Sequence, residues 1–110
     1  MMVEIREYAD EEGCSPFADW FEGLDAMAAA KVTVALARLG TGNFSNVKGV
    51  GAGLLEYRID FGPGYRLYFG KDGDTLVILL AGGTKRRQQK DIEAAQARWA
   101  NYKARRKGRE

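Results

Sequence analysis

Three segments of this 110-residue chain carry cations at positions where they could act on one anion. Arg58 and Arg66 lie in consecutive segments that alternate like β-strands, and Lys85 opens a basic run directly after a third such segment. A guanidinium group binds phosphate oxygens through two parallel hydrogen bonds, so arginines held on a rigid sheet can grip a polyanion. The spacing therefore predicts an anion site, and nucleic acid is its first expected ligand.

Side-chain parity in the first two segments decides whether these arginines cooperate. Apolar positions alternate with Glu56 and Arg58 in the first segment, and with Arg66 and Tyr68 in the second. A turn of odd length sets Arg58 opposite Arg66, and Glu56 opposite Tyr68, away from the apolar face. A turn of even length would force a cation onto the apolar face, so we expect the first register.

Two arginines that face each other repel unless an anion lies between them. Glu56 or Asp60 could supply that anion from within the chain, which would make the arrangement purely structural. A phosphate group of RNA could supply it instead, and nearby aromatic rings would then stack on bases. Those rings belong to Tyr57, Tyr65 and Tyr68, of which the first two are also expected in the core.

A cationic site of this kind could also cleave RNA. RNA breaks when its 2′-OH attacks the adjacent phosphorus, and an enzyme assists with a base, an acid and positive charge around the phosphorane. Arginine stays protonated, so Arg58 and Arg66 are the candidate transition-state stabilisers, while Lys85 and Tyr68 are the candidates for proton transfer. The candidates for RNA binding are the basic residues that follow, Arg86, Arg87 and Lys90.

Composition excludes several other functions. The chain holds no histidine and one cysteine, Cys14, so it lacks the usual zinc ligands, the usual base for a catalytic thiol and any intrachain disulfide. We expect no metal and no cofactor. No apolar run approaches the roughly 20 residues of a membrane helix, and the N-terminus does not resemble a secretory signal. We therefore expect a cytoplasmic protein with no membrane partner.

Charge is distributed unevenly along the chain. Acidic residues dominate positions 1–30 and basic residues dominate positions 84–110, although the formal net charge is only +2. Each single charge is most simply a solvated side chain. Clustered cations nevertheless attract polyanions, with a strength that falls as salt rises.

The first half of the chain predicts one strand and two helices. Residues 3–8 alternate as a strand does, Ser15 and Pro16 form a helix start, and Asp25 can cap a second helix. The connection is short enough for an αα-hairpin. We expect the second helix to bury an apolar side and residues 41–53 to form an irregular loop. That side comprises Met27, Ala30, Val34 and Leu39.

The second half predicts three strands, at residues 54–60, 65–70 and 75–80, followed by a helix over residues 88–104. The third strand is apolar on both faces, which places it centrally in the sheet. We therefore expect an α+β fold with an antiparallel four-stranded sheet, an N-terminal αα-hairpin inserted after the first strand and a C-terminal helix. Residues 1–104 form the single expected domain, and the basic tail 105–110 is expected to fray.

A long string in this half resembles a known family. The run GLLEYRIDFGPGYRLYFGKDGDTLVILLAGGTKRRQQKDIEAA, with SPFADWFEGL upstream, is similar to the HigB-like (phage Gp49-like) branch of the RelE/ParE toxin superfamily, the addiction-module killer proteins. The resemblance continues to Trp99 and covers nearly the whole chain. It implies a small RelE-like α+β toxin of a type II toxin–antitoxin system.

The resemblance also implies an activity and partners. Many members are metal-independent endoribonucleases that cut mRNA in the decoding site of the ribosome and so inhibit translation, and a co-encoded antitoxin, often a helix-turn-helix protein, neutralises them. Their basic sheet residues match Arg58, Arg66 and Lys85, with Arg86 as a further contact. The acidic N-terminal third is an expected docking region for basic residues of the antitoxin.

The chain departs from the family pattern at three points. It has no histidine, Ile92 stands where a tyrosine would help, and Thr84 replaces an acidic residue. These departures affect the identity of the general acid and base more than the reaction itself. Three functions stay open: an mRNA endoribonuclease, a ParE-like toxin that inhibits DNA gyrase without cleaving anything, and an inactive interaction module.

Overall fold

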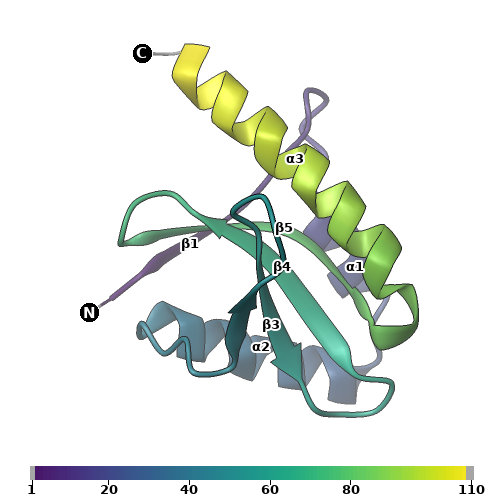
Figure 1. Cartoon of the computed structure of the whole chain (residues 1–110). Helices are drawn as coiled ribbons and strands as arrows, with labels where there is room; N and C mark the ends of the chain where they lie inside the picture. The colour runs from purple at the N-terminus through teal and green to yellow at the C-terminus, as the bar shows by residue number, and fades with distance from the viewer. Residues whose placement is uncertain (1, 109–110) are drawn as a thin grey trace.

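The computed structural model describes residues 2–108 as one mixed sheet with helices on both faces (Figure 1). The strand order is β1-β5-β4-β3-β2. The strands are β1 (Glu4–Glu7), β2 (Val47–Gly49), β3 (Leu55–Ile59), β4 (Tyr65–Lys71) and β5 (Leu76–Thr84). The helices are α1 (Pro16–Glu22), α2 (Ala26–Gly40) and α3 (Gln88–Gly108), and a short 3₁₀ turn, η1 (Lys85–Arg87), joins β5 to α3.

The sheet differs in two ways from the antiparallel four-stranded sheet expected from the sequence. β1 pairs with β5 in parallel. The helical hairpin α1–α2 and the strands β2, β3 and β4 lie between them in the chain, and after these elements β5 runs beside β1 in the same direction. A fifth strand, β2, lies within residues 41–53, which were expected to form a loop, and it pairs with β3 through three residues. The glycine-rich composition of residues 41–53 is typical of loops, so the strand conformation of β2 depends on its tertiary contact with β3.

The expected helix starts are confirmed. The Ser15 hydroxyl accepts a hydrogen bond from the backbone N–H of Ala18 at 3.1 Å, and Pro16 occupies the first turn of α1. The Asp25 carboxylate accepts one from the backbone N–H of Ala28 at 2.9 Å. These side chains satisfy backbone donors that would otherwise have no partner, which fixes where both helices begin.

The buried side of α2 differs from the expected one. Met27 and Val34 are 63% and 50% exposed, and Ala30 is exposed as well. The expectation was therefore wrong for those three residues and right for Leu39. An alanine-rich helix offers two apolar stripes of similar strength, and contact with the sheet selects one of them. The selected stripe comprises Ala28, Val32, Ala35 and Leu39.

Two hydrophobic cores lie on opposite faces of the sheet. On one face, α1 and α2 pack on a core that includes Phe17, Leu39 and Leu67. On the other face, α3 packs on a second core that includes Ile78 and Trp99 (Figure 1). The alternation of β3 and β4 predicted that their polar residues lie on a non-core face. That face is in fact covered in part by α3, so its polar residues are divided between buried and exposed positions.

The tail also differs from expectation. Residues 105–108, expected to fray, continue α3. The Arg105 guanidinium donates a hydrogen bond to the backbone carbonyl of Ala9 at 2.6 Å, and Arg106 pairs with Asp72. These contacts with distant parts of the chain explain why the helix extends further than its apolar pattern. Residues 109 and 110 lie outside the described residues.

Within residues 2–108, no helix combines the length and apolar character needed to cross a membrane. The same range contains no cluster of three or more acidic, histidine or cysteine side chains suited to a metal ion.

We expect Gly70→Ala to destabilise the fold. A Cβ atom at Gly70 would lie 2.6 Å from ring atoms of Trp99, so α3 would have to shift away from β4. Overpacking of this kind costs about 2 kcal/mol, measurable by urea unfolding. The matched control is Gly49→Ala, where a Cβ atom would meet nothing within 4 Å. Equal stability of the two variants would contradict the close packing of Trp99 on β4.

Candidate functional site

The register of β3 and β4 places the two arginines opposite each other, as expected. Arg58 pairs with Arg66 and Glu56 pairs with Tyr68 along the two antiparallel strands. The connecting turn contains Gly62 and Gly64, both with positive φ angles (56° and 79°), which residues with a Cβ rarely adopt. The glycine content of the turn therefore fixes the register that aligns the guanidinium groups.

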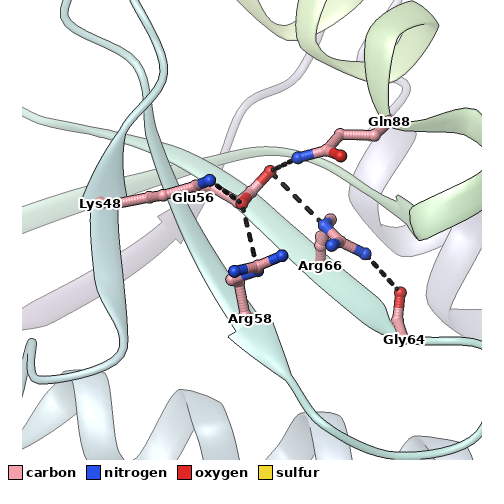
Figure 2. A network of polar contacts seen from close by, with 6 residues as sticks. All are labelled: Lys48, Glu56, Arg58, Gly64, Arg66 and Gln88. Atoms are coloured by element: carbon pink, nitrogen blue, oxygen red, sulfur yellow. Dashed lines mark hydrogen bonds and ion pairs between the residues drawn. The ribbon is translucent and has the colours of Figure 1, made fainter.

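A buried carboxylate, that of Glu56, forms ion pairs with both arginines (Figure 2). Its Oε2 atom lies 3.6 Å from Nε of Arg66, and its Oε1 atom lies 3.9 Å from both Nε of Arg58 and Nζ of Lys48. Gln88, at the start of α3, donates a hydrogen bond to Oε2 at 2.8 Å. The chain thus supplies an internal anion, which was one of the two alternatives left open by the sequence.

The two arginines differ sharply in exposure. The side chain of Arg66 is 4% exposed, and its Nη1 atom donates a hydrogen bond to the backbone carbonyl of Gly64 at 3.0 Å. The side chain of Arg58 is 54% exposed, and within residues 2–108 its one ion pair is the long contact with Glu56. Arg66 is therefore a fixed charge, whereas Arg58 can reach a ligand in solvent.

A cavity of about 380 Å³ opens beside this network. Three of the residues selected from the sequence line it: Arg58, Arg66 and Lys85. The backbone N–H of Lys85 donates a hydrogen bond to the carbonyl of Gly64 at 2.8 Å, which brings the end of β5 against the β3–β4 turn. We call this cavity the arginine cleft. Its remaining lining residues are Ile59, Asp60, Gly64 and Tyr65.

The arginine cleft keeps a positive balance despite Glu56. Its lining carries three cations and one carboxylate, that of Asp60. Glu56 is fully buried behind the cleft and offsets one further charge. An anion that enters the cleft therefore meets exposed Arg58 and Lys85 in front of a fixed Arg66. Such an arrangement suits a phosphate group, whose oxygens accept charge-assisted hydrogen bonds from several donors.

Tyr68 does not reach the arginine cleft, in contrast to its expected role in proton transfer. Its side chain is fully buried in the core beneath α3. Burial raises the pKa of Tyr68, and the carboxylates of Glu56 and Asp91 raise that pKa further. A phenol in this position holds its proton and has no contact with the cavity. Strand parity correctly placed Tyr68 on the face of Arg66, but it could not show that α3 covers that position.

The three candidate RNA-binding residues lie outside the cleft lining. Arg86 and Arg87 are exposed on η1, and Lys90 is exposed on the first turn of α3. They follow Lys85 along the chain and extend the positive charge from the cleft toward α3. The structure therefore brings Arg58, Arg66 and Lys85 together and leaves this second group on the adjoining surface.

The sequence pattern did not identify two residues of the polar network. Lys48 and Gln88 both contact Glu56, and they come from the unexpected β2 and from the distant start of α3. The pattern did not identify Asp91 of α3 either, whose carboxyl has a pKa raised by burial and lowered by Arg87 and Arg98. In the structure the carboxylate of Asp91 lies against Gly83, where a Cβ atom would collide with it.

Comparisons with known proteins identify the family of this chain. The family described as phage derived protein Gp49-like (DUF891) matches residues 19–100, a range that includes every cation of the arginine cleft. An uncharacterized protein of Haemophilus influenzae is 45% identical over 80 residues, which cover 72% of this chain and 81% of that protein. The chain therefore belongs to the Gp49-like family, which is a family of RelE-like toxins.

We expect Glu56→Ala to lower the free energy of unfolding by about 3 kcal/mol, because it leaves the buried Arg66 without its counter-charge. Chemical denaturation followed by circular dichroism measures this loss. The matched control, Glu93→Ala, removes an exposed carboxylate of α3 and should change stability little. Similar values for the two variants would show that Glu56 does not hold the arginine pair together.

Proposed function

We propose that this protein is the toxin of a type II toxin–antitoxin system, of the HigB-like branch, and that it cleaves mRNA on the ribosome. The observation that carries the proposal is the convergence of Arg58, Arg66 and Lys85 on one cleft. Membership of the Gp49-like family supports the toxin assignment. The cleavage reaction and its RNA substrate are inferred from the chemistry of the cleft.

The cleft residues would divide the work of stabilising a phosphorane. Arg58 and Lys85 are exposed and would contact the non-bridging phosphate oxygens directly. Arg66 is held by Glu56 and by the carbonyl of Gly64, so its charge is oriented before substrate arrives. Charge that is already in place needs no reorganisation during the reaction, which is how fixed donors stabilise a transition state.

Proton transfer has few candidates in this cleft. Burial removes Tyr68 from consideration, and the lining residues able to exchange a proton are Lys85, Asp60 and Tyr65. A sparse set of acids and bases suits a nuclease whose substrate is oriented by a second macromolecule. Alignment of the 2′-OH with the phosphorus contributes a large share of the rate, and the ribosome would supply that alignment.

One observation favours the alternative of a toxin that binds DNA gyrase, or of an inactive interaction module. Glu56 already neutralises part of the arginine pair, and an arginine pair with an internal anion needs no substrate. The exposed Arg58 and Lys85 favour the nuclease, since neither is fully compensated within residues 2–108. In either case the proposal places the protein in the cytoplasm with a co-encoded antitoxin, most simply a helix-turn-helix protein.

We expect Arg58→Ala to reduce mRNA cleavage about a hundredfold, because it removes a charge that contacts the reacting phosphate. Arg58 is preferred to Arg66 for this test, since loss of the buried Arg66 would also destabilise the fold. The measurement is the mapping of mRNA 5′ ends after induction in a bacterial host, together with cleavage by purified protein on translating ribosomes.

The matched control is Arg6→Ala, which removes an exposed arginine from β1, at the opposite edge of the sheet from β2 and β3. Cuts that persist with the control and disappear with Arg58→Ala would support the nuclease. Growth arrest with intact mRNA and broken DNA would instead support the gyrase alternative. Normal growth and intact nucleic acids with the wild-type protein would support the inactive module.

A further inference from the structure

A second cavity, of about 300 Å³, opens beside α2 on the face opposite α3. We call it the α2 cleft. It shares Arg58, Ile59 and Asp60 with the arginine cleft. The two clefts therefore form one continuous surface that passes around the end of β3. The polar and aromatic residues of the α2 cleft used below are Lys31, Arg38, Asn46 and Phe61.

The surface is continuous because the edge of the sheet is open at this point. β2 pairs with β3 only from Leu55 to Tyr57. One further backbone contact, from the N–H of Arg58 to the carbonyl of Asn46 at 3.4 Å, follows this pairing. Beyond it, no strand within residues 2–108 covers the outer side of β3. A flexible chain could thus pass from one face of the sheet to the other at Arg58.

The α2 cleft is positively charged. Lys31 and Arg38 are seven residues apart on α2, so they lie on one side of the helix and about 10 Å apart along its axis. Both are exposed, and neither forms an ion pair within the described part of the chain. With Arg58 they face a single carboxylate in this cleft, that of Asp60. The cationic lining of the arginine cleft thus continues onto α2.

Two aromatic rings lie where the clefts meet. Phe61 lines the α2 cleft and Tyr65 lines the arginine cleft. Their rings stack with centroids 6.4 Å apart and an interplanar angle of 22°. Nζ of Lys31 lies 5.2 Å from the centroid of Phe61. Rings beside a cationic track are the usual means by which proteins hold single-stranded nucleic acid, because every base offers a face for stacking.

We propose that the α2 cleft is a second phosphate-binding subsite for single-stranded RNA. One phosphate would lie in the arginine cleft, while phosphates several nucleotides along the strand would contact Lys31 and Arg38. The path bends around the edge of β3, so it suits an unpaired strand and excludes a stiff duplex. This inference rests on the proposed function and deepens it, since it defines the form and length of the RNA that the protein holds.

The test uses 2′-O-methyl RNA, which cannot be cleaved by attack of its own 2′-OH, in lengths of three and nine nucleotides. Fluorescence anisotropy gives Kd for the wild type and for the double variant Lys31→Ala/Arg38→Ala over a range of salt concentrations. We expect the double variant to bind the longer RNA roughly tenfold more weakly at low salt, with a salt slope lower by about 1.4, the value for two lost phosphate contacts. Binding of the shorter RNA should be nearly unchanged.

Two further variants sharpen the result. Lys103→Ala/Lys107→Ala removes the same charge from the far end of α3 and should leave both Kd values within twofold of wild type. Asp60→Asn removes the carboxylate shared by the two clefts and should tighten binding of the longer RNA several-fold. Circular dichroism checks that each variant is folded.

The outcomes separate this inference from the proposed function. If the α2 double variant and the wild type share the same Kd and salt slope for the longer RNA, the second subsite is wrong, even where mRNA cleavage is observed. If binding depends on Lys31 and Arg38 but the wild type cuts no mRNA, the subsite stands and the nuclease falls. If the wild type binds neither RNA at low salt, the second subsite is wrong, and the mapped mRNA cuts alone decide on the nuclease.

Discussion

The candidate site depends on the pairing of one buried carboxylate with two facing arginines. The β3–β4 register brings Arg58 and Arg66 together, and such a pair would push the strands apart without a counter-charge. Glu56 supplies that charge, while Gln88 and Gly64 fix the positions of the carboxylate and of Arg66 (Figure 2). The same contacts join β3, β4 and the start of α3, so the polar network contributes both to the fold and to the geometry of the cleft.

This pairing reconciles two interpretations that the sequence presented as alternatives. An internal anion and an external phosphate need not exclude each other when the arginines differ in exposure. Glu56 compensates the buried Arg66, and the exposed Arg58 joins Lys85 in facing the cavity. The fixed charge of Arg66 lies behind the accessible charges of Arg58 and Lys85. A surface of this kind can stabilise negative charge that develops on a ligand without reorganising its own buried groups.

The edge of the sheet shapes the positive surface as much as its face does. β2 is short, so β3 remains open from Arg58 onward and the positive surface continues toward α2. Had β2 extended over residues 58–60, it would have separated the two clefts. The glycine-rich segment before β3 therefore affects the shape of this surface although none of its glycines lines either cavity.

The sequence by itself determined the features that depend on neighbours along the chain. The caps at Ser15 and Asp25, the glycine-containing turn and the alternation of β3 and β4 follow from local rules, and so does the pairing of Arg58 with Arg66. The family string added the expected positions of the cleft cations. These local signals were enough to select the three residues that the structure brings together in one cleft.

Only the tertiary structure decided which side chains are buried and which segments become strands by contact. The alternation pattern gave Tyr68 and Arg58 the same face, yet α3 covers one and leaves the other in solvent. β2, the parallel pairing of β1 and the buried side of α2 likewise depend on surfaces brought together from far along the chain. Burial depends on the complete tertiary structure, because these side chains lose contact with solvent only when an element from far along the chain packs over them.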